Sequence, residues 1–233
     1  MKRLFIIIAI FLFFIVAVCA CAANLSPEEK FKKSFPDRKV ESMTPSPIKG
    51  VYEVYTGNEL FYYAPDADLL IYGNIVNKER ASLTRESFLK KLTPKMAQIP
   101  LESSLKIGKG KNIIVEFMDP DCFHCREAFK FFSQRKDVTI YVFFYPLSLN
   151  SERKIKHILC SANQVKTYEE AMSGKFDNNA QLNVCTDTKV EELLKTHKKF
   201  AAQIGIRSTP FFYLKGQVID GFEAPMFEKL LKD

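Results

Sequence analysis

Two cysteines three positions apart give this 233-residue chain its most reactive chemistry. Cys122 and Cys125 enclose the dipeptide Phe123-His124. Cysteines at this spacing can close and reopen a short disulfide, and the thiolate form of one of them can attack a disulfide in another molecule. The pattern therefore predicts a redox-active dithiol.

The neighbouring segments should place this dithiol where a strand ends and a helix begins. Residues 113–118 form an apolar run that predicts a buried strand, and residues 125–133 carry apolar side chains at helical spacing. Cys122 would then lie at a helix N-terminus, where free N–H groups and the helix dipole stabilise a thiolate. A protonated His124 would add a cation. Together these effects would lower the Cys122 pKa from about 8.5 into the range of about 3.5–7.5.

The composition predicts a globular protein. Hydrophobic residues make up 47% of the chain and aromatic residues 13%, which is ample for a packed core and excludes wholesale disorder. The net charge is +7, but the chain has no block of Lys and Arg and no nucleic-acid-binding motif. We therefore expect a solvated basic surface and no nucleic-acid partner.

The N-terminus predicts export. A basic start at Lys2-Arg3 precedes an apolar run over 4–18, and small residues follow, so we interpret residues 1–22 as a signal peptide. Residues 1–20 could instead be a lipoprotein signal that leaves Cys21 lipidated. An uncleaved anchor is the third alternative. All three place the rest of the chain outside the cytosol.

The cysteine count is consistent with an oxidising compartment. Six cysteines minus the two in the leader leave four, and an even number indicates two disulfides. The simplest pairing makes Cys122–Cys125 the reactive bond and Cys160–Cys185 a structural one. A zinc site is the alternative, but Cys160 and Cys185 are too far apart to form a second ligand pair. We expect no metal and no other cofactor.

Residues 24–83 predict a small separate domain. Ser26 should cap a short helix, a connector should follow over 39–47, and β-forming runs between 48 and 76 are broken by turn residues at 57–58. This tyrosine-rich meander would bury too little surface to be stable alone. We expect it to pack on a second copy of itself, as a dimerisation domain, or alternatively on the rest of the chain.

The remaining residues predict a linker and a larger domain. Residues 84–111, with Thr84 as a helix N-cap, are interpreted as a helical linker. In 112–233 the predicted order is β-α-β, a helical insertion at about 150–205, and β-β-α, which is the order of a thioredoxin fold. Thr209-Pro210 directly precedes the late apolar strand over 211–214.

These motifs together resemble the DsbC/DsbG-type thiol:disulfide isomerases, a bacterial periplasmic family. The likeness covers residues 48–233 and rests on Gly50-Val51-Tyr52-Glu53-Val54, Ile71-Tyr72-Gly73, Phe117-Met118-Asp119 before the dithiol, the Cys160/Cys185 pair, Gly205 with Ser208-Thr209-Pro210, and Gly221-Phe222 with Pro225. It implies an α/β protein: a thioredoxin fold with a helical insertion, plus a small N-terminal α+β (cystatin-like) dimerisation domain. It also implies a cis Pro210 that faces the dithiol and a Thr209 close to Cys122. Phe123 would join them in binding substrate.

At two positions the residue type matches the pattern of the disulfide oxidases instead. A histidine at the position of His124 is typical of the strongly oxidising DsbA type. Glu116 lies six residues before Cys122, where thioredoxin- and DsbA-like proteins carry a buried acid. Such a carboxylate could accept the proton of Cys125. The alternative for Glu116 is a solvent-facing position on a strand edge.

The predicted function is an exported, periplasmic thiol:disulfide oxidoreductase, an isomerase or reductase of misfolded proteins with additional chaperone activity. The alternatives are a dimeric DsbA-like oxidase and a non-catalytic chaperone or assembly factor. The resemblance implies a homodimer that acts on unfolded or mis-disulfided exported proteins. Its redox partner would be a DsbD-like membrane thiol reductase, or a quinone-linked oxidase if the protein is an oxidase.

Overall fold

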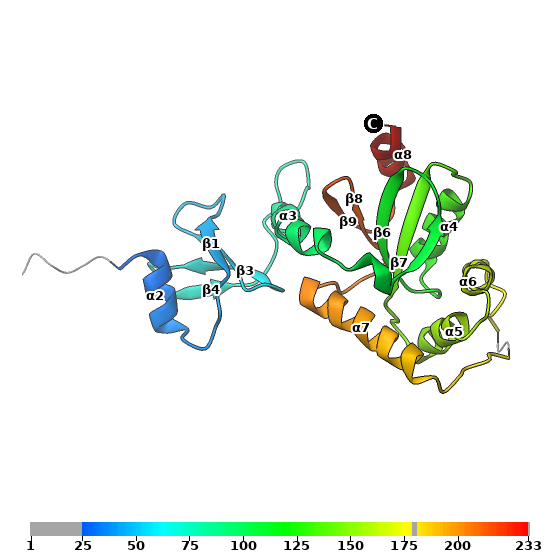
Figure 1. Cartoon of the computed structure of the whole chain (residues 1–233). Helices are drawn as coiled ribbons and strands as arrows, with labels where there is room; N and C mark the ends of the chain where they lie inside the picture. The colour runs from blue at the N-terminus through cyan, green and yellow to red at the C-terminus, as the bar shows by residue number, and fades with distance from the viewer. Residues whose placement is uncertain (1–24, 179–180, 233) are drawn as a thin grey trace, which may run out of the picture. The chain divides into compact units, whose positions relative to one another are not determined.

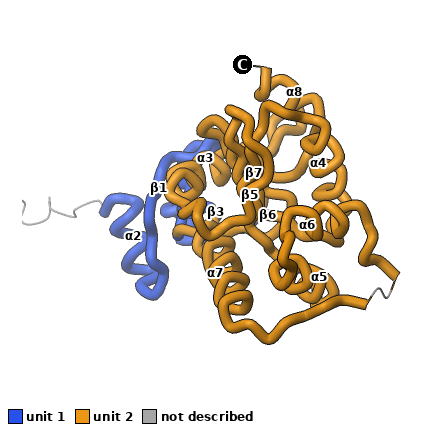
Figure 2. Tube along the Cα trace, turned by 45° about the vertical axis from the view of Figure 1, so that its right-hand side comes forward, with its two compact units in different colours: residues 1–56, 61–72 blue, residues 57–60, 73–233 orange. Residues whose placement is uncertain are grey.

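The computed structural model describes residues 25–178 and 181–232, which divide into two compact units (Figure 2). The first comprises the described residues up to 56 together with 61–72, and the second comprises 57–60 and 73–232. The predicted signal peptide and the lipidation candidate Cys21 lie outside the described residues. Within the described ranges, no helix is both long enough and apolar enough to cross a membrane.

The first unit is a helix packed on a four-stranded sheet (Figure 1). The helix begins as predicted, because Ser26 and Glu29 form a reciprocal capping box. Phe31 from the helix packs with Val54, Phe61 and Tyr63 from the sheet in a small apolar core. The elements are α2 (Pro27–Ser34) and, in their order across the sheet, β1 (Ser42–Pro45), β2 (Tyr52–Tyr55), β3 (Leu60–Ala64) and β4 (Leu69–Ile71).

Two strands of this unit differ from the sequence prediction. The expected connector over 39–47 contains strand β1, which pairs antiparallel with β2. The run predicted as a strand up to residue 76 ends at Ile71. Both differences arise because strand pairing is non-local: β1 has a partner strand that its own sequence does not reveal, and the pairing of β4 with β3 stops at the Ile71–Tyr62 pair.

The second unit is built on a five-stranded sheet with the order β5-β7-β6-β8-β9. β6 and β7 are parallel and are connected by α4 (Phe123–Ser133), while every other neighbouring pair is antiparallel (Figure 1). This is the thioredoxin arrangement that the element order predicted. The strands are β5 (Leu105–Gly108), β6 (Asn112–Met118), β7 (Val138–Phe144), β8 (Phe211–Leu214) and β9 (Gln217–Asp220).

The segment interpreted as a helical linker, 84–111, contributes to this second unit. α3 (Leu83–Ala97) packs against β8 and β9, a short 3-10 turn follows at Leu101–Ser103, and β5 pairs with β7 at the edge of the sheet. The N-cap of α3 is Ser82 and not Thr84, whose hydroxyl instead accepts a hydrogen bond from a preceding loop. In β5, more buried and more exposed side chains alternate over only four residues. Because lysines and glycines flank this short pattern, the sequence alone does not predict a strand there.

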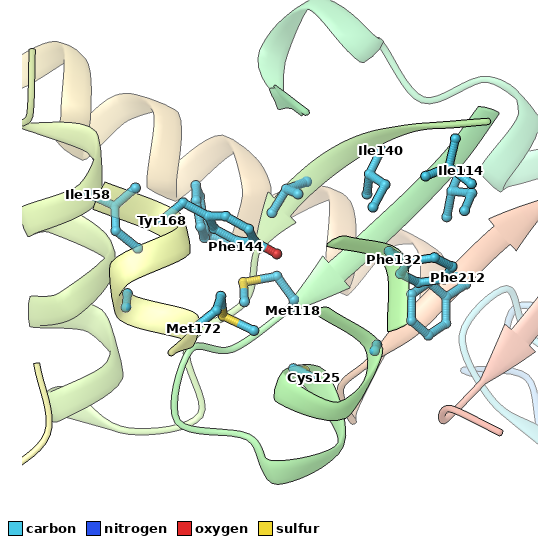
Figure 3. Close-up of a cluster of buried hydrophobic side chains, with 14 of the residues drawn as sticks. Ile114, Met118, Cys125, Phe132, Ile140, Phe144, Ile158, Tyr168, Met172 and Phe212 are labelled. Atoms are coloured by element: carbon cyan, nitrogen blue, oxygen red, sulfur yellow. The ribbon is translucent and has the colours of Figure 1, made fainter. Parts of the chain in front are cut away.

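The helical insertion reaches both sides of the sheet: its segment around Tyr168 lies on the side that carries α4, and its segment around His197 lies on the opposite side. Figure 3 shows Cys125 and Phe132 of α4 facing the same buried cluster as Met118 of β6 and Tyr168 of the insertion. On the opposite side, Phe143 packs against His197 with ring centroids 5.0 Å apart. The helices of the insertion are α5 (Leu149–Leu159), α6 (Gln164–Met172) and α7 (Thr188–Ile204), and α8 (Ala224–Lys232) ends the described chain.

Candidate dithiol active site

The end of strand β6 places the two cysteines at the start of α4. Cys122 is the N-cap residue of the helix, and Cys125 lies in its first turn. The turn is closed by the Cys122 amide, which donates to the Asp119 carbonyl oxygen at 3.1 Å. Both cysteines are free thiols, with Cys122 half-buried and Cys125 fully buried. The sequence therefore placed the dithiol correctly, at the point where the strand ends and the helix begins.

The surroundings of Cys122 favour its thiolate and lower its pKa to about 5. The largest contribution is the hydrogen bond that the Cys125 thiol donates to it; the Thr209 side chain and the backbone N–H groups of Cys125 and His124 add to this. Partial burial opposes the shift but does not cancel it. Cys122 is consequently the sulfur that is ready to attack near neutral pH.

His124 contributes to the lowered Cys122 pKa through its backbone N–H group. The ring nitrogen Nδ1 lies 2.8 Å from Glu127 Oε2, and the side chain is 63% exposed. Glu127, three residues along the helix, thus binds the ring, and the expected cation beside Cys122 stays a prediction. What His124 contributes is an N–H group at the helix N-terminus.

The Thr209-Pro210 segment faces the dithiol from the start of β8. The peptide bond between these two residues is cis, as the resemblance implied. The Cys122 Sγ atom lies 3.3 Å from the Thr209 carbonyl oxygen. The Thr209 hydroxyl has no hydrogen-bond partner among the described residues while Cys122 is a thiol. A hydrogen bond from the Thr209 side chain is among the causes that lower the Cys122 pKa.

Glu116 is a buried carboxyl group in the centre of the sheet. It pairs with Val142 on one side and Phe212 on the other, and only 1% of its surface is exposed. The alternative of a solvent-facing position on a strand edge is therefore wrong. Its Oε1 atom has no hydrogen-bond partner among the described residues. Burial, and then the charge on Cys122, raise the Glu116 pKa to about 8.

Cys125 has the opposite properties to Cys122. Burial is the main reason that its pKa is raised, followed by the hydrogen bond it donates to Cys122 and by the negative charge of Glu116. Cys125 thus keeps its proton near neutral pH, where Cys122 is ionised. Removing that proton requires a base next to it, and Glu116 is the titratable carboxyl group whose charge acts on Cys125.

A cavity of about 250 Å³ reaches Glu116 between α4 and α6. Its walls are mainly apolar and include Phe129, Val165 and Tyr168, while Arg135 and Glu169 are among its polar residues. The volume is sufficient for several water molecules, which need a polar partner such as the free Glu116 oxygen. The cavity offers the buried carboxyl group a route for exchanging protons.

Exposed apolar side chains lie next to Cys122 and on the segment after β7. Phe123 is 69% exposed, and Leu147 and Leu149 in the segment after β7 are also exposed. The Leu147 amide donates to Asp119 Oδ2 at 2.6 Å, so this segment adjoins the dithiol loop. Sequence reasoning selected Phe123 but missed both leucines, because nothing local connects them to a cysteine 25 residues or more away in the chain.

The predicted structural disulfide has a clear position. Cys160, the C-cap of α5, forms a disulfide with Cys185, 25 residues later in the chain and just before α7. This is the pairing that the cysteine count indicated. Among residues 25–178 and 181–232, no three His, Cys, Asp or Glu side chains lie together in a way that could hold a metal ion.

Two family models match most of the chain. Residues 19–85 match the disulfide bond isomerase protein N-terminal domain, and residues 103–233 match the thioredoxin-like domain. The second match alone covers more than half of the 233 residues. The boundary between the two matches falls within the segment that contains α3 and the 3-10 turn.

Curated relatives and a solved structure agree with these matches. A probable thiol:disulfide interchange protein DsbC of Bordetella avium is 30% identical over 192 residues, which are 80% of this chain and 66% of that protein. The chain thus spans just under two thirds of the length of this relative. DsbC of Escherichia coli K12 is 24% identical, with coverage of 80% and 78%. The crystal structure of the thiol-disulfide exchange protein alpha-DsbA2 of Wolbachia pipientis shares the fold, with a TM-score of 0.52, 15% identity and coverage of 65% and 98%. The chain therefore belongs to the DsbC-type family of thioredoxin-like proteins, as its motifs indicated.

Proposed function

We propose that this protein is an exported thiol:disulfide interchange protein that isomerises and reduces incorrect disulfides through Cys122 and Cys125. The observation that carries the proposal is the contrast between the two sulfur atoms. Cys122 is partly accessible and its pKa is lowered to about 5, whereas Cys125 is buried and its pKa is raised. The Cys122 sulfur is suited to attack a substrate disulfide, and the Cys125 sulfur is suited to resolve the mixed disulfide that forms.

The reaction begins with the Cys122 thiolate. It attacks one sulfur of a substrate disulfide, forms a mixed disulfide and releases the other substrate sulfur as a thiolate. If a substrate thiolate then attacks the mixed disulfide, Cys122 is released and the net result is isomerisation. If Cys125 attacks the Cys122 sulfur instead, the substrate leaves with two more electrons and the Cys122–Cys125 disulfide forms. The reverse sequence oxidises a substrate dithiol.

Glu116 is proposed as the base for the Cys125 step. Its Oε1 atom has no hydrogen-bond partner among the described residues, and its raised pKa of about 8 matches the task of taking a proton near neutral pH. The proton would then leave through the cavity between α4 and α6, in which Glu116 is a lining residue.

The surface around the dithiol suits an unfolded polypeptide. Phe123, Leu147 and Leu149 expose apolar side chains, and the cis Thr209–Pro210 segment lies beside the attacking sulfur. A protein whose core side chains are exposed would bind such a surface through its own apolar residues. The same contacts would support chaperone activity.

The first unit supports a homodimer. β4 is an edge strand, and Leu69, Ile71 and the following Tyr72 are each more than 40% exposed. An apolar edge strand of this kind is a template for pairing with another chain. We propose a second copy of the protein as its partner, in the periplasm, with a DsbD-like membrane reductase that returns the dithiol to its reduced form.

An oxidase is the second candidate, and the low pKa of Cys122 favours it. A stabilised thiolate stabilises the reduced dithiol, which makes the corresponding disulfide a stronger oxidant. In that case a quinone-linked oxidase would be the redox partner. The reduction potential of the Cys122–Cys125 pair distinguishes the two candidates: a value close to that of the strong periplasmic oxidant, about −120 mV, would favour the oxidase.

The direct test is the reactivation of a substrate with scrambled disulfides. The wild-type protein should restore activity, Cys122→Ser should not, and Cys125→Ser should retain part of the isomerisation while accumulating mixed disulfides. A Cys122→Ser/Cys125→Ser variant that promotes folding as well as the wild-type protein would overturn the proposal and favour the non-catalytic chaperone.

A further inference from the structure

A buried lysine lies behind the dithiol loop, and the reaction described above does not use it. Lys154 of α5 has a side chain that is only 3% exposed. Its ammonium group lies 2.5 Å from Asp121 Oδ1 and also contacts Asp177 Oδ1. Asp121 immediately precedes Cys122 in the chain, so the lysine is linked to the attacking cysteine through a single residue.

Arg126 of α4 completes a group of four charges. Its guanidinium forms two hydrogen bonds to Asp177, at 2.7 and 2.8 Å, and lies 3.4 Å from Asp121. Its Nε atom also donates to the Pro120 carbonyl oxygen at 2.7 Å. Two cations and two carboxylates therefore share one site, which we name the charge quartet: Asp121, Arg126, Lys154 and Asp177.

The quartet joins three segments that are distant in the sequence. Asp121 belongs to the dithiol loop, Lys154 belongs to α5, and Asp177 follows α6. Gly174 makes room for this arrangement, because it has a φ of +83° and a Cβ at its position would lie 3.0 Å from Asp177 Oδ2. The helical insertion is thereby attached to the loop that carries Cys122.

The dithiol loop has few other supports on this side. Asn150 donates to Asp121 Oδ2 at 2.8 Å, and the Asp119 carboxylate accepts the Asp121 and Leu147 amides at 2.6 Å each. These bonds set the path of the loop from Asp119 to Cys122. Of the side chains that bind Asp121, the lysine is the one that is buried, and a buried ammonium group between two carboxylates is held far more rigidly than a surface ion pair.

We propose that Lys154 is a positioning residue that, through Asp121, holds Cys122 in its reactive place beside Thr209. This inference deepens the proposed function and rests on Cys122 being the attacking thiol. The Lys154 ammonium group contacts the carboxylates of Asp121 and Asp177 and not the sulfur of Cys122. It acts by fixing the loop, so that the Cys122 sulfur stays within reach of Thr209 and of the N–H groups at the start of α4.

The test measures Cys122 itself in the isolated, reduced protein. In Lys154→Met, the loop loses its anchor and Asp121 loses its buried counter-ion. We expect the Cys122 pKa, followed by thiolate absorbance, to rise by about one unit, the order of shift that a displaced or uncompensated charge produces. Alkylation of Cys122 at about pH 4, below both pKa values, should slow about tenfold because the thiolate fraction falls by that amount, whereas near pH 6 the rate should fall only about twofold. The disulfide should also become less oxidising.

Lys156→Met is the matched control. Lys156 lies on the same helix and pairs with Glu191 at 2.7 Å and with Glu152 at 3.2 Å, but not with the dithiol loop. The Lys156→Met substitution removes the same charge from the same helix as Lys154→Met does. Because Lys156 does not bind the dithiol loop, the Cys122 pKa should stay at the wild-type value. An equal shift in both variants would overturn the proposal, because the effect would then be one of overall charge.

A second variant keeps the proposal testable if Lys154→Met does not fold. Asn150 is exposed, so Asn150→Asp should fold normally while replacing a donor to Asp121 with a like charge. We expect a smaller rise in the Cys122 pKa, larger at low salt than at high salt because surface charges are screened. If Lys154→Met and Asn150→Asp both kept the Cys122 pKa and alkylation rate of the wild-type protein, the charge quartet would be purely structural. This conclusion would hold whether or not the variants lost thermal stability.

These readouts are independent of the isomerase assay. If the wild-type protein failed to reactivate a scrambled substrate, the proposed function would fall, but the comparison of Cys122 pKa values would still decide the role of Lys154. Conversely, an unchanged pKa in Lys154→Met would overturn this inference and leave the isomerase proposal intact.

Discussion

The Cys122 sulfur lies 3.3 Å from the carbonyl oxygen of Thr209, although 87 residues separate them in the chain. This contact joins the start of α4 to the start of β8 and brings the attacking thiol against the cis Thr209–Pro210 segment. A substrate that extends along this segment would present its disulfide to Cys122 and not to the buried Cys125. The predictions below depend on this asymmetry.

The alkylation rate of the reduced protein should show an inflection at about pH 5, because the Cys122 pKa is lowered to about 5. Below that pH the thiol is protonated and slow, and above it the rate should reach a plateau well before pH 7. Iodoacetamide labelling followed by peptide mass analysis measures this. Cys122→Ser is the control and should remove the fast phase, while an inflection near pH 9, or faster labelling of Cys125, would reverse the assignment.

Glu116→Gln should stabilise the reduced protein above about pH 5. The folded-state pKa of Glu116 is raised from 4.5 to about 8, so between these values the folded state holds a proton that the unfolded state has lost. Wild-type stability should therefore fall as pH rises through this window, and the variant should not share the loss. Urea unfolding from pH 4.5 to 8.5 should show a difference that grows to a few kcal/mol.

The same substitution should slow the step that involves Cys125. With no carboxylate to accept its proton, Cys125 should resolve mixed disulfides about 10²-fold more slowly, the lower end of the range for a lost general base. Stopped-flow measurements on a preformed mixed disulfide would test this, with the Cys122 alkylation rate as the internal control. Unchanged resolution in Glu116→Gln would show that another base acts.

Removal of the Cys160–Cys185 disulfide should weaken the fold without ending thiol exchange. The bond closes a loop of 25 residues, which corresponds to about 3.5 kcal/mol in the chain-entropy model. Cys160→Ala/Cys185→Ala should therefore lose roughly that free energy of unfolding but keep the alkylation profile of Cys122. If a still-folded double variant lost exchange activity altogether, the bond would have a catalytic part.

His197 should make the protein less stable in mild acid. Its ring is fully buried, accepts the Phe144 amide at Nδ1 and binds the Ser103 carbonyl through Nε2, and burial lowers its pKa. The unfolded state therefore binds a proton from about pH 6.5 downward before the folded state does, and stability is lost as pH falls through that region. Thermal melts between pH 4 and 8 should show a smaller acid loss in His197→Gln, whereas an acid loss equal to that of the wild-type protein would show that another group is responsible.

Leu69→Glu/Ile71→Glu should convert the proposed dimer into a monomer. Both side chains are exposed on the edge strand β4, so charges there should not disturb the fold but should prevent a second chain from pairing. Light scattering at several concentrations measures the mass. Ile48→Glu, an exposed apolar residue outside β4, is the control and should remain dimeric. A wild-type protein that is monomeric would rule out the dimer.

The sequence alone determined the parts of this protein that depend on short-range patterns. The Cys122–Cys125 spacing, the apolar run before it and the helical face after it fix the chemistry and its place at a helix N-terminus, because all three lie within about twenty residues. The capping box at Ser26 and the pairing of Cys160 with Cys185 follow from local rules and from counting. The family was also visible in these motifs.

Only the tertiary structure decided which groups surround the sulfur atoms. The burial of Glu116 depends on strands that cover it from both sides, and the binding of His124 to Glu127 depends on side-chain direction within the helix. Strand β5 and the position of Lys154 depend on partners from distant segments, and no local propensity encodes those. Electrostatic interactions act through space, so a residue's protonation and role are set by neighbours that the linear order does not reveal.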